Sequence, residues 1–178
     1  MQALTSLLVI LVLGSCGASS GEVKSAREAS YAADPATLFN EVKTTTEHTY
    51  KVAAVDTNTL ALRTVPRWYT PDGQVDTKAG DNPSSVQDLS INLTLLVGLS
   101  KVDSRSYKVM VEPIVRRKNG LASEPQEVKM TDPSVPGWVQ GKIDALQLDI
   151  HRKLAGYAVV EPPAAADDRR PAAPSSGW

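Results

Sequence analysis

The chain has 178 residues, with 19 Lys or Arg, 20 Asp or Glu and a net charge of −1, so its charge gives no reason to expect nucleic acid as a partner. Its single cysteine excludes an internal disulfide. Because it has only three Trp, five Tyr and one Phe, a core would have to be mainly aliphatic. The length suits one domain with a sizeable core rather than two.

The first fifteen residues are typical of a secretory signal peptide. The apolar run Leu7 to Leu13 forms a dense hydrophobic block, and it is followed by the small residues Gly14 and Ser15. This block is far shorter than the roughly 20 residues that a transmembrane helix needs. Residues 1–15 are therefore expected to direct export and then to be removed.

The sequence Leu13-Gly14-Ser15-Cys16 resembles the lipobox of bacterial lipoproteins. The resemblance implies that a signal peptidase recognises Leu13, Gly14 and Ser15, cleaves before Cys16, and leaves Cys16 carrying lipid chains. The membrane would then be a partner through lipidated Cys16, since each buried methylene contributes roughly 0.8 kcal/mol to binding. The absence of Asp after Cys16 resembles outer-membrane sorting, so we expect an outer-membrane anchor facing the periplasm. The alternative is an ordinary free or buried cysteine.

Residues 16–33 are rich in Gly, Ala and Ser and predict a flexible tether. Asp34 then has the character of an N-cap with Pro35 at the first helical position. The spacing of Leu38 and Val42 predicts a helix from Pro35 to about Glu47, ending near His48.

From Tyr50 the apolar period becomes two, which predicts strands over residues 50–55 and 60–65 joined by a turn. Residues 67–69 are expected to continue along an edge or beyond a bend, since Pro66 lacks a donor for the ladder. The following segment, 70–85, predicts a long loop, which is either functional or disordered.

Strict alternation from Leu89 to Leu99 predicts a long strand with one face on a core and the other toward solvent. A further strand is expected over residues 107–117, bent or at an edge because of Pro113. The pattern of residues 121–130 is ambiguous, and a short edge strand over residues 127–129 is one interpretation of it.

Apolar residues at spacings of three and four predict a helix from Trp138 to Leu154, with Gly156 as its stop signal. The α+β domain is thus expected to cover residues 34–157. Residues 158–178 are rich in Pro and Ala and predict a disordered tail.

The predicted fold class is α+β, with an antiparallel sheet of four to five strands and two helices packed on one face. The order of elements, with the hairpin from Tyr50 to Thr64 and the late helix opened by Trp138, resembles the helix-grip domains of bacterial envelope lipoproteins, such as the C lipoprotein of the outer-membrane β-barrel assembly machinery. This resemblance implies a non-catalytic protein that docks onto other envelope components.

Motifs for catalysis, metal binding or cofactor binding do not occur in the sequence, so no enzyme activity, metal or cofactor is predicted. For His48 and His151 a solvent or helix-terminal role is favoured over catalysis. Four aspartates in or near the long loop could gather around calcium, but they lack the spacing of an EF-hand, and a solvated loop is preferred; they are Asp72, Asp76, Asp81 and Asp88.

The best candidate for a partner-binding surface is Arg67-Trp68-Tyr69, because these residue types supply most interface anchors. The alternative is that Trp68 packs under the long loop while Arg67 is simply exposed. The basic cluster Arg116 to Lys118 could face anionic headgroups, although a solvated turn is preferred.

Two functions of different class are consistent with these observations. The favoured one is a lipid-anchored cell-envelope interaction or scaffold module that binds another envelope protein. The alternative is a small-ligand (lipid) carrier, or an uncharacterised enzyme, with a cavity between the sheet and the helices.

Overall fold

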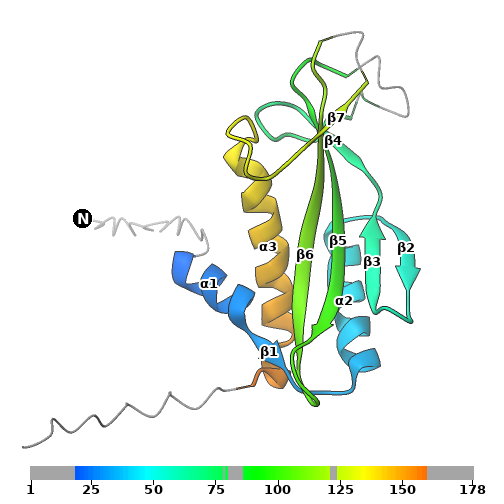
Figure 1. Ribbon diagram of the computed structural model, residues 1–178, viewed down its shortest axis with the longest axis vertical. Helices are drawn as coiled ribbons and strands as arrows, with labels where there is room; N and C mark the ends of the chain where they lie inside the picture. Colours follow the sequence, from blue (N-terminus) through cyan, green and yellow to red (C-terminus); the bar gives the residue numbers. More distant parts are fainter. Residues whose placement is uncertain (1–18, 78, 80–85, 121–123, 160–178) are drawn as a thin grey trace, which may run out of the picture.

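The computed structural model describes residues 19–77, 79, 86–120 and 124–159. Three α-helices and seven strands lie within these residues (Figure 1). In chain order they are α1 (Ser20–Glu28), β1 (Ser30–Tyr31), α2 (Pro35–Thr49), β2 (Val52–Asp56), β3 (Ala61–Thr64), β4 (Arg67–Tyr69), β5 (Ile91–Lys101), β6 (Tyr107–Arg117), β7 (Gln126–Val128) and α3 (Gly137–Lys153), which the 3-10 helix η2 (Ala155–Tyr157) follows.

The strands form one antiparallel sheet in the order β1-β6-β5-β3-β2, with β4 paired to β5 and β7 paired to β6. The predicted α+β class with an antiparallel sheet is confirmed. The number of strands is higher than predicted, because β1, β4 and β7 have only two or three residues each and pair with parts of the two long strands.

Strands β5 and β6 are the centre of the sheet and pair along their whole length, from Ile91 opposite Arg117 to Lys101 opposite Tyr107. The expected alternation along β5 is only partly observed. Leu89 precedes the strand, has a φ of 64° and is 51% exposed. Ser90 and Thr94, expected on the solvent face, are buried. Ser90 precedes β5, and Thr94 lies opposite the larger Ile114 of β6 on the same face.

Pro113 lies in β6 where the strand has a partner on one side only. Strand β1 pairs with residues 107–108 of β6, and β7 pairs with residues 115–117, so that Pro113 falls between the two. On its other side Pro113 is opposite Leu95 of β5. This position fits the expectation of an edge, since proline cannot donate to a second ladder.

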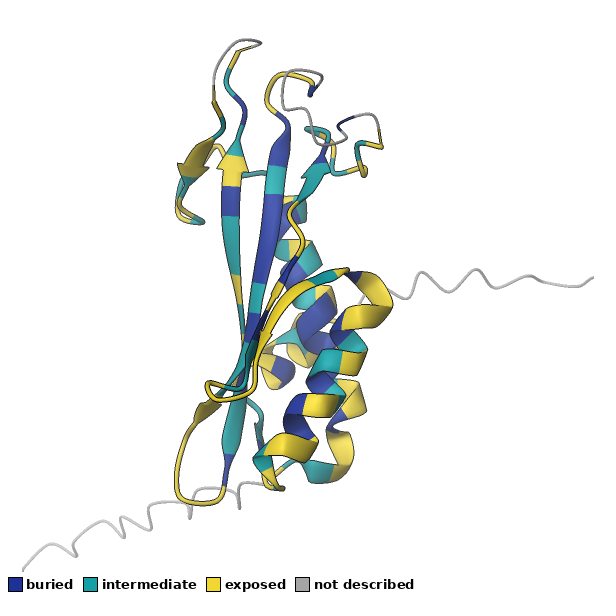
Figure 2. Cartoon of the chain, turned by 90° about the vertical axis from the view of Figure 1, so that its right-hand side faces the viewer, coloured by how far each residue is buried: buried dark blue, intermediate teal, exposed yellow. Residues whose placement is uncertain are grey.

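Helices α2 and α3 cover one face of the sheet, and Figure 2 shows them together on one side of the long strands. Asp34 caps the start of α2, and its Oδ2 accepts a hydrogen bond from the Thr37 N–H at 3.0 Å. The two predicted helices are confirmed within about two residues at their ends. Their apolar sides form the core together with the inner side of the sheet, through Leu38, Phe39, Val42, Val139, Ile143, Leu146 and Ile150.

The segment predicted as a flexible tether contains regular structure, so that prediction is wrong for residues 20–31. Ser19 and Glu22 form a capping box at the start of α1. Ala26 is buried, and its carbonyl accepts a hydrogen bond from the buried Gln147 of α3. A salt bridge from Arg27 to Asp144 joins the same two helices. Helix α1 therefore belongs to the domain, through contacts that composition does not reveal.

The predicted tail begins slightly too early. Ala158 bridges Tyr31 of β1, and the Val159 N–H donates to the Ser30 carbonyl at 2.8 Å. Residues 160–178 lie outside the described residues, as does the whole lipobox-like sequence.

Candidate functional site

Strand β4 divides the predicted contact surface between the two faces of the sheet. Arg67, Trp68 and Tyr69 pair with Leu93, Asn92 and Ile91 of β5. Because side chains alternate along a strand, Arg67 and Tyr69 lie on the helix-covered face, while Trp68 lies on the open face. Tyr69 is only 1% exposed. The three side chains therefore do not form one contact surface, since Tyr69 is buried and Trp68 lies on the opposite face from Arg67.

Arg67 and Tyr69 instead belong to a group of side chains that we call the β4 cluster: Tyr50, Arg67, Tyr69, Trp138 and Lys142. The Tyr69 and Trp138 rings have centroids 5.3 Å apart and are tilted by 46°. The Lys142 Nζ lies 4.6 Å from the Tyr69 centroid and 5.7 Å from the Trp138 centroid. The Arg67 Cζ lies 5.7 Å from the centroid of Tyr50. The cluster therefore places two cations on aromatic faces.

The first part of the long loop fixes Trp138 in this cluster. The Trp138 indole N–H donates to the carbonyl of Pro71 at 2.9 Å. Gly73, with a φ of 88°, lies so close that a Cβ built on it would be 2.8 Å from Trp138 Cγ. Hydrogen bonds within residues 70–74 hold this turn in place, and the Asp76 N–H donates to the Trp68 carbonyl of β4. Residues 70–76 thus brace the start of α3.

The β4 cluster holds two cations beside aromatic rings, and no acidic side chain of the described residues pairs with either cation. Burial raises the pKa of Tyr50 to about 12, while the nearby Arg67 acts in the opposite direction. The pKa of Lys142 is lowered, first by burial and then by Arg67. Among the described residues, neither Arg67 nor Lys142 takes part in a salt bridge. An arriving carboxylate would meet two cations without displacing an existing acidic partner.

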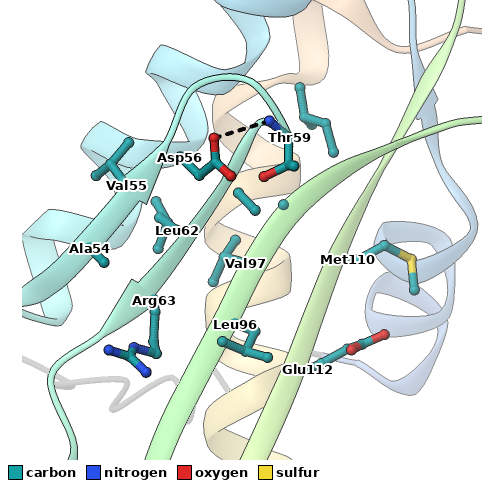
Figure 3. Close-up of a pocket in the computed structure, with 13 residues that line it drawn as sticks. Ala54, Val55, Asp56, Thr59, Leu62, Arg63, Leu96, Val97, Met110 and Glu112 are labelled. Carbon is teal, nitrogen blue, oxygen red and sulfur yellow. Dashed lines mark hydrogen bonds between the residues drawn. The ribbon is translucent and has the colours of Figure 1, made fainter.

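The open face of the sheet has a hollow of about 480 Å³, shown in Figure 3. Its residues come from β2, β3, β5, β6 and the turn between β2 and β3. By strand register, Arg63, Leu96 and Glu112 form one row across three adjacent strands, and Ala61, Gly98 and Met110 form the next row. Most of the lining is apolar or small, and its charged residues are Arg63, Glu112 and Asp56. The Asp56 carboxylate accepts hydrogen bonds from the Asn58 and Thr59 N–H groups in the turn to β3. Sequence patterns could not reveal these rows, because they depend on register between strands.

The basic cluster Arg116 to Lys118 is not the solvated turn that was preferred. Lys118 is only 1% exposed. Its backbone continues the sheet, because its N–H donates to the Ser90 carbonyl and its carbonyl accepts from the Leu89 N–H. Arg116 and Arg117 thus belong to β6, and the Lys118 backbone extends it.

Two of the aspartates considered for calcium accept hydrogen bonds from groups of the protein. Asp88 Oδ1 accepts from the N–H groups of Leu89 and Gly120, and Asp72 accepts from the Thr70 hydroxyl. Asp81 lies outside the described residues. Within the described part of the chain, no group of three or more His, Cys, Asp or Glu side chains could hold a metal ion.

His48 and His151 both lie in the last turns of helices, as expected. His151 is not simply solvated, since its Nδ1 lies 2.9 Å from the hydroxyl oxygen of the buried Tyr31.

The expected lipidation residue Cys16 and its flanking residues Leu13, Gly14 and Ser15 lie outside the described residues. In the part that is described, none of the helices is both long and apolar enough to cross a membrane. Comparison with known proteins gave no assignment: no family model matches the chain, and no curated protein matches it.

Proposed function

We propose that this protein is a lipid-anchored bacterial cell-envelope protein that acts as a non-catalytic interaction or scaffold module. Its anchor would be Cys16 in the outer membrane, with the folded domain facing the periplasm. The sequence Leu13-Gly14-Ser15-Cys16 supports the anchor. Its partner would be another envelope protein that presents an acidic surface to the β4 cluster.

The observation on which the binding proposal rests is the position of Arg67 and Lys142. Both cations lie against aromatic rings, which restrict their side chains before any partner arrives. Arg, Trp and Tyr are the residue types that contribute most to binding energy at interfaces. An acidic partner would gain both electrostatic attraction and aromatic contact here, and charge complementarity would favour the correct orientation.

The anchor is tested by the intact mass of the native protein and by labelling with a fatty acid. We expect the mature protein to begin at Cys16 and to gain the mass of two or three acyl chains. The variant Cys16→Ser should lose the label and leave the membrane fraction. An N-terminus at Met1, or a free thiol at Cys16, would contradict the proposed location.

The partner is tested by crosslinking in the native organism, with a photoreactive residue at the exposed position 145, three residues after Lys142 in α3, followed by mass spectrometry. A second measurement compares recovery of the captured protein by Arg67→Glu and Lys142→Glu. Each reversal should reduce recovery about ten-fold, within the range measured for charge pairs at interfaces. Arg105→Glu, in the turn between β5 and β6, is the matched control and should leave recovery unchanged. Equal recovery of the captured protein by all three variants would contradict the assignment of partner binding to Arg67 and Lys142.

The same experiment separates the proposal from a lipid carrier. A carrier would give no specific protein partner, but a lipid would co-purify with it. That result would replace the scaffold proposal with the carrier alternative.

A further inference from the structure

Each of the two rows of residues in the hollow of the open face has unlike residues on its two sides. One row has opposite charges on its two sides, and the other has a large side chain on one side and a small one on the other. In the first row, Leu96 of the central strand lies between Arg63 on one neighbouring strand and Glu112 on the other. Figure 3 shows these three side chains across the three strands. The positive and negative charges are therefore about equally far from the central strand, on opposite sides.

In the second row, Gly98 of the central strand lies between Ala61 and Met110. Met110 is 40% exposed, whereas the two residues beside it have almost no side chain. An added Cβ on Gly98 would come within 3.2 Å of the Leu60 carbonyl oxygen, so this position has little space for a larger residue. Met110 thus projects on one side of Gly98, while Ala61 leaves the other side low as far as Asp56 of β2, which is opposite Ala61 and is held in the turn by the Asn58 N–H.

A two-fold axis that lies in the interface and runs along β5 would exchange the two sides of each row. Arg63 of one copy would then face Glu112 of the other, and the same pair would occur twice. Met110 of each copy would lie over Ala61 and Gly98 of its partner, and Leu96 would meet its own symmetry mate. Face-to-face sheets lie about 10 Å apart with strands within about 30° of each other, so these rows remain opposite near the axis.

We propose that a second copy of this chain docks on the open face of the sheet, with Leu96 at the two-fold axis. The arrangement is isologous, since the same patch serves both subunits. No helix of the described residues covers this open face, and the dimer would bury the apolar hollow between two sheets. This interface is separate from the β4 cluster, whose Arg67 and Tyr69 lie on the helix-covered face.

The first test is crosslinking of the full chain in its native membrane. Leu96→Cys treated with a short bis-maleimide should give a covalent dimer, because the two Leu96 positions lie next to each other at the axis. Arg105→Cys, in the turn between β5 and β6, is the matched control and should stay monomeric. Equal dimer yields from both variants would overturn the proposal.

The second test uses charge reversal in the Leu96→Cys background. Arg63→Glu and Glu112→Arg should each reduce dimer yield about ten-fold, since each turns two attractive pairs into repulsive ones. When the two variants carry different tags and are expressed together, they should form a mixed dimer, because each reversed charge then meets its opposite. The double variant in one chain should also dimerise.

Circular dichroism of each purified single variant should match the parent, which separates loss of docking from loss of fold. Failure of the mixed pair to dimerise, with both variants folded, would reject this interface. Dimerisation of the single variants at the parent's level would reject it as well.

Discussion

The hydroxyl oxygen of Tyr31 lies 2.9 Å from Nδ1 of His151, and this contact joins β1 to the last turn of α3. Tyr31 is fully buried, so its hydroxyl cannot turn to water instead. We expect Tyr31→Phe to lower the free energy of unfolding by about 1 kcal/mol, and His151→Ala to do the same. In urea titrations the double variant should lose little more than either single variant. A fully additive loss would show that the contact contributes nothing.

Alkaline pH should weaken the fold through its buried tyrosines. Burial raises the pKa of Tyr31 and of Tyr50 to about 12. Because their pKa in the folded state exceeds the ordinary value of 10.0, these tyrosines stay protonated to a higher pH in the folded state than in the unfolded chain. The stability is complete below pH 10 and is lost as pH rises toward 12, by about 2 kcal/mol for each tyrosine.

This pH dependence is measured from urea titrations between pH 8 and 11.5. Tyr31→Phe should show a shallower decline than the parent above pH 10, whereas Tyr157→Phe, at a partly exposed position, is the control. A parent protein whose free energy of unfolding is flat above pH 10 would contradict the assignment.

Two glycines give opposite predictions for the same substitution. Gly73→Ala would place a methyl group against Trp138 at a φ of 88°, so we expect a loss of about 2 kcal/mol. Gly141→Ala, inside α3 with nothing within 4 Å of the new methyl, should gain about 0.5 to 1 kcal/mol from helix propensity. Thermal unfolding distinguishes the two. A neutral Gly73→Ala would show that the turn moves freely away from α3.

The long elements were predictable because their signals repeat along the chain. The alternation between Ile91 and Leu99 and the helical spacing after Trp138 each extend over many residues. The short strands were harder to predict, because the two residues of β1 are extended only by virtue of pairing with residues 107–108. Such pairing depends on tertiary structure, which a local pattern does not contain.

The candidate site was predictable in part. Arg67 was identified from residue type, but the side of the sheet on which it lies depends on the register between β4 and β5. Its partner cation Lys142 is 75 positions away in the sequence, on a helix where a lysine looks like an ordinary solvated residue. The role of Lys142 in the cluster depends on the contact of its ammonium group with the Tyr69 and Trp138 rings, which only the folded structure reveals.

Helix α1 shows why composition was misleading. Gly, Ala and Ser near the N-terminus indicated flexibility, but Ser19 and Glu22 have the three-residue spacing of a capping box. That signal was present in the sequence, whereas the hydrogen bond from Gln147 to Ala26 was not. A short helix of nine residues is marginal alone, so both contributions are needed.

The capping box predicts a local loss of protection when it is removed. Ser19→Ala takes away the acceptor for the Glu22 N–H and should destabilise α1 by about 1 kcal/mol. Hydrogen exchange of the amides of residues 23–28 should then be about five-fold faster, while the amides of β5 stay unchanged, since α1 can open without the sheet. Ser25→Ala, at an exposed position inside the same helix, is the control and should exchange no faster than the parent. If Ser19→Ala leaves exchange in α1 at the parent's rate, tertiary contacts alone hold the helix.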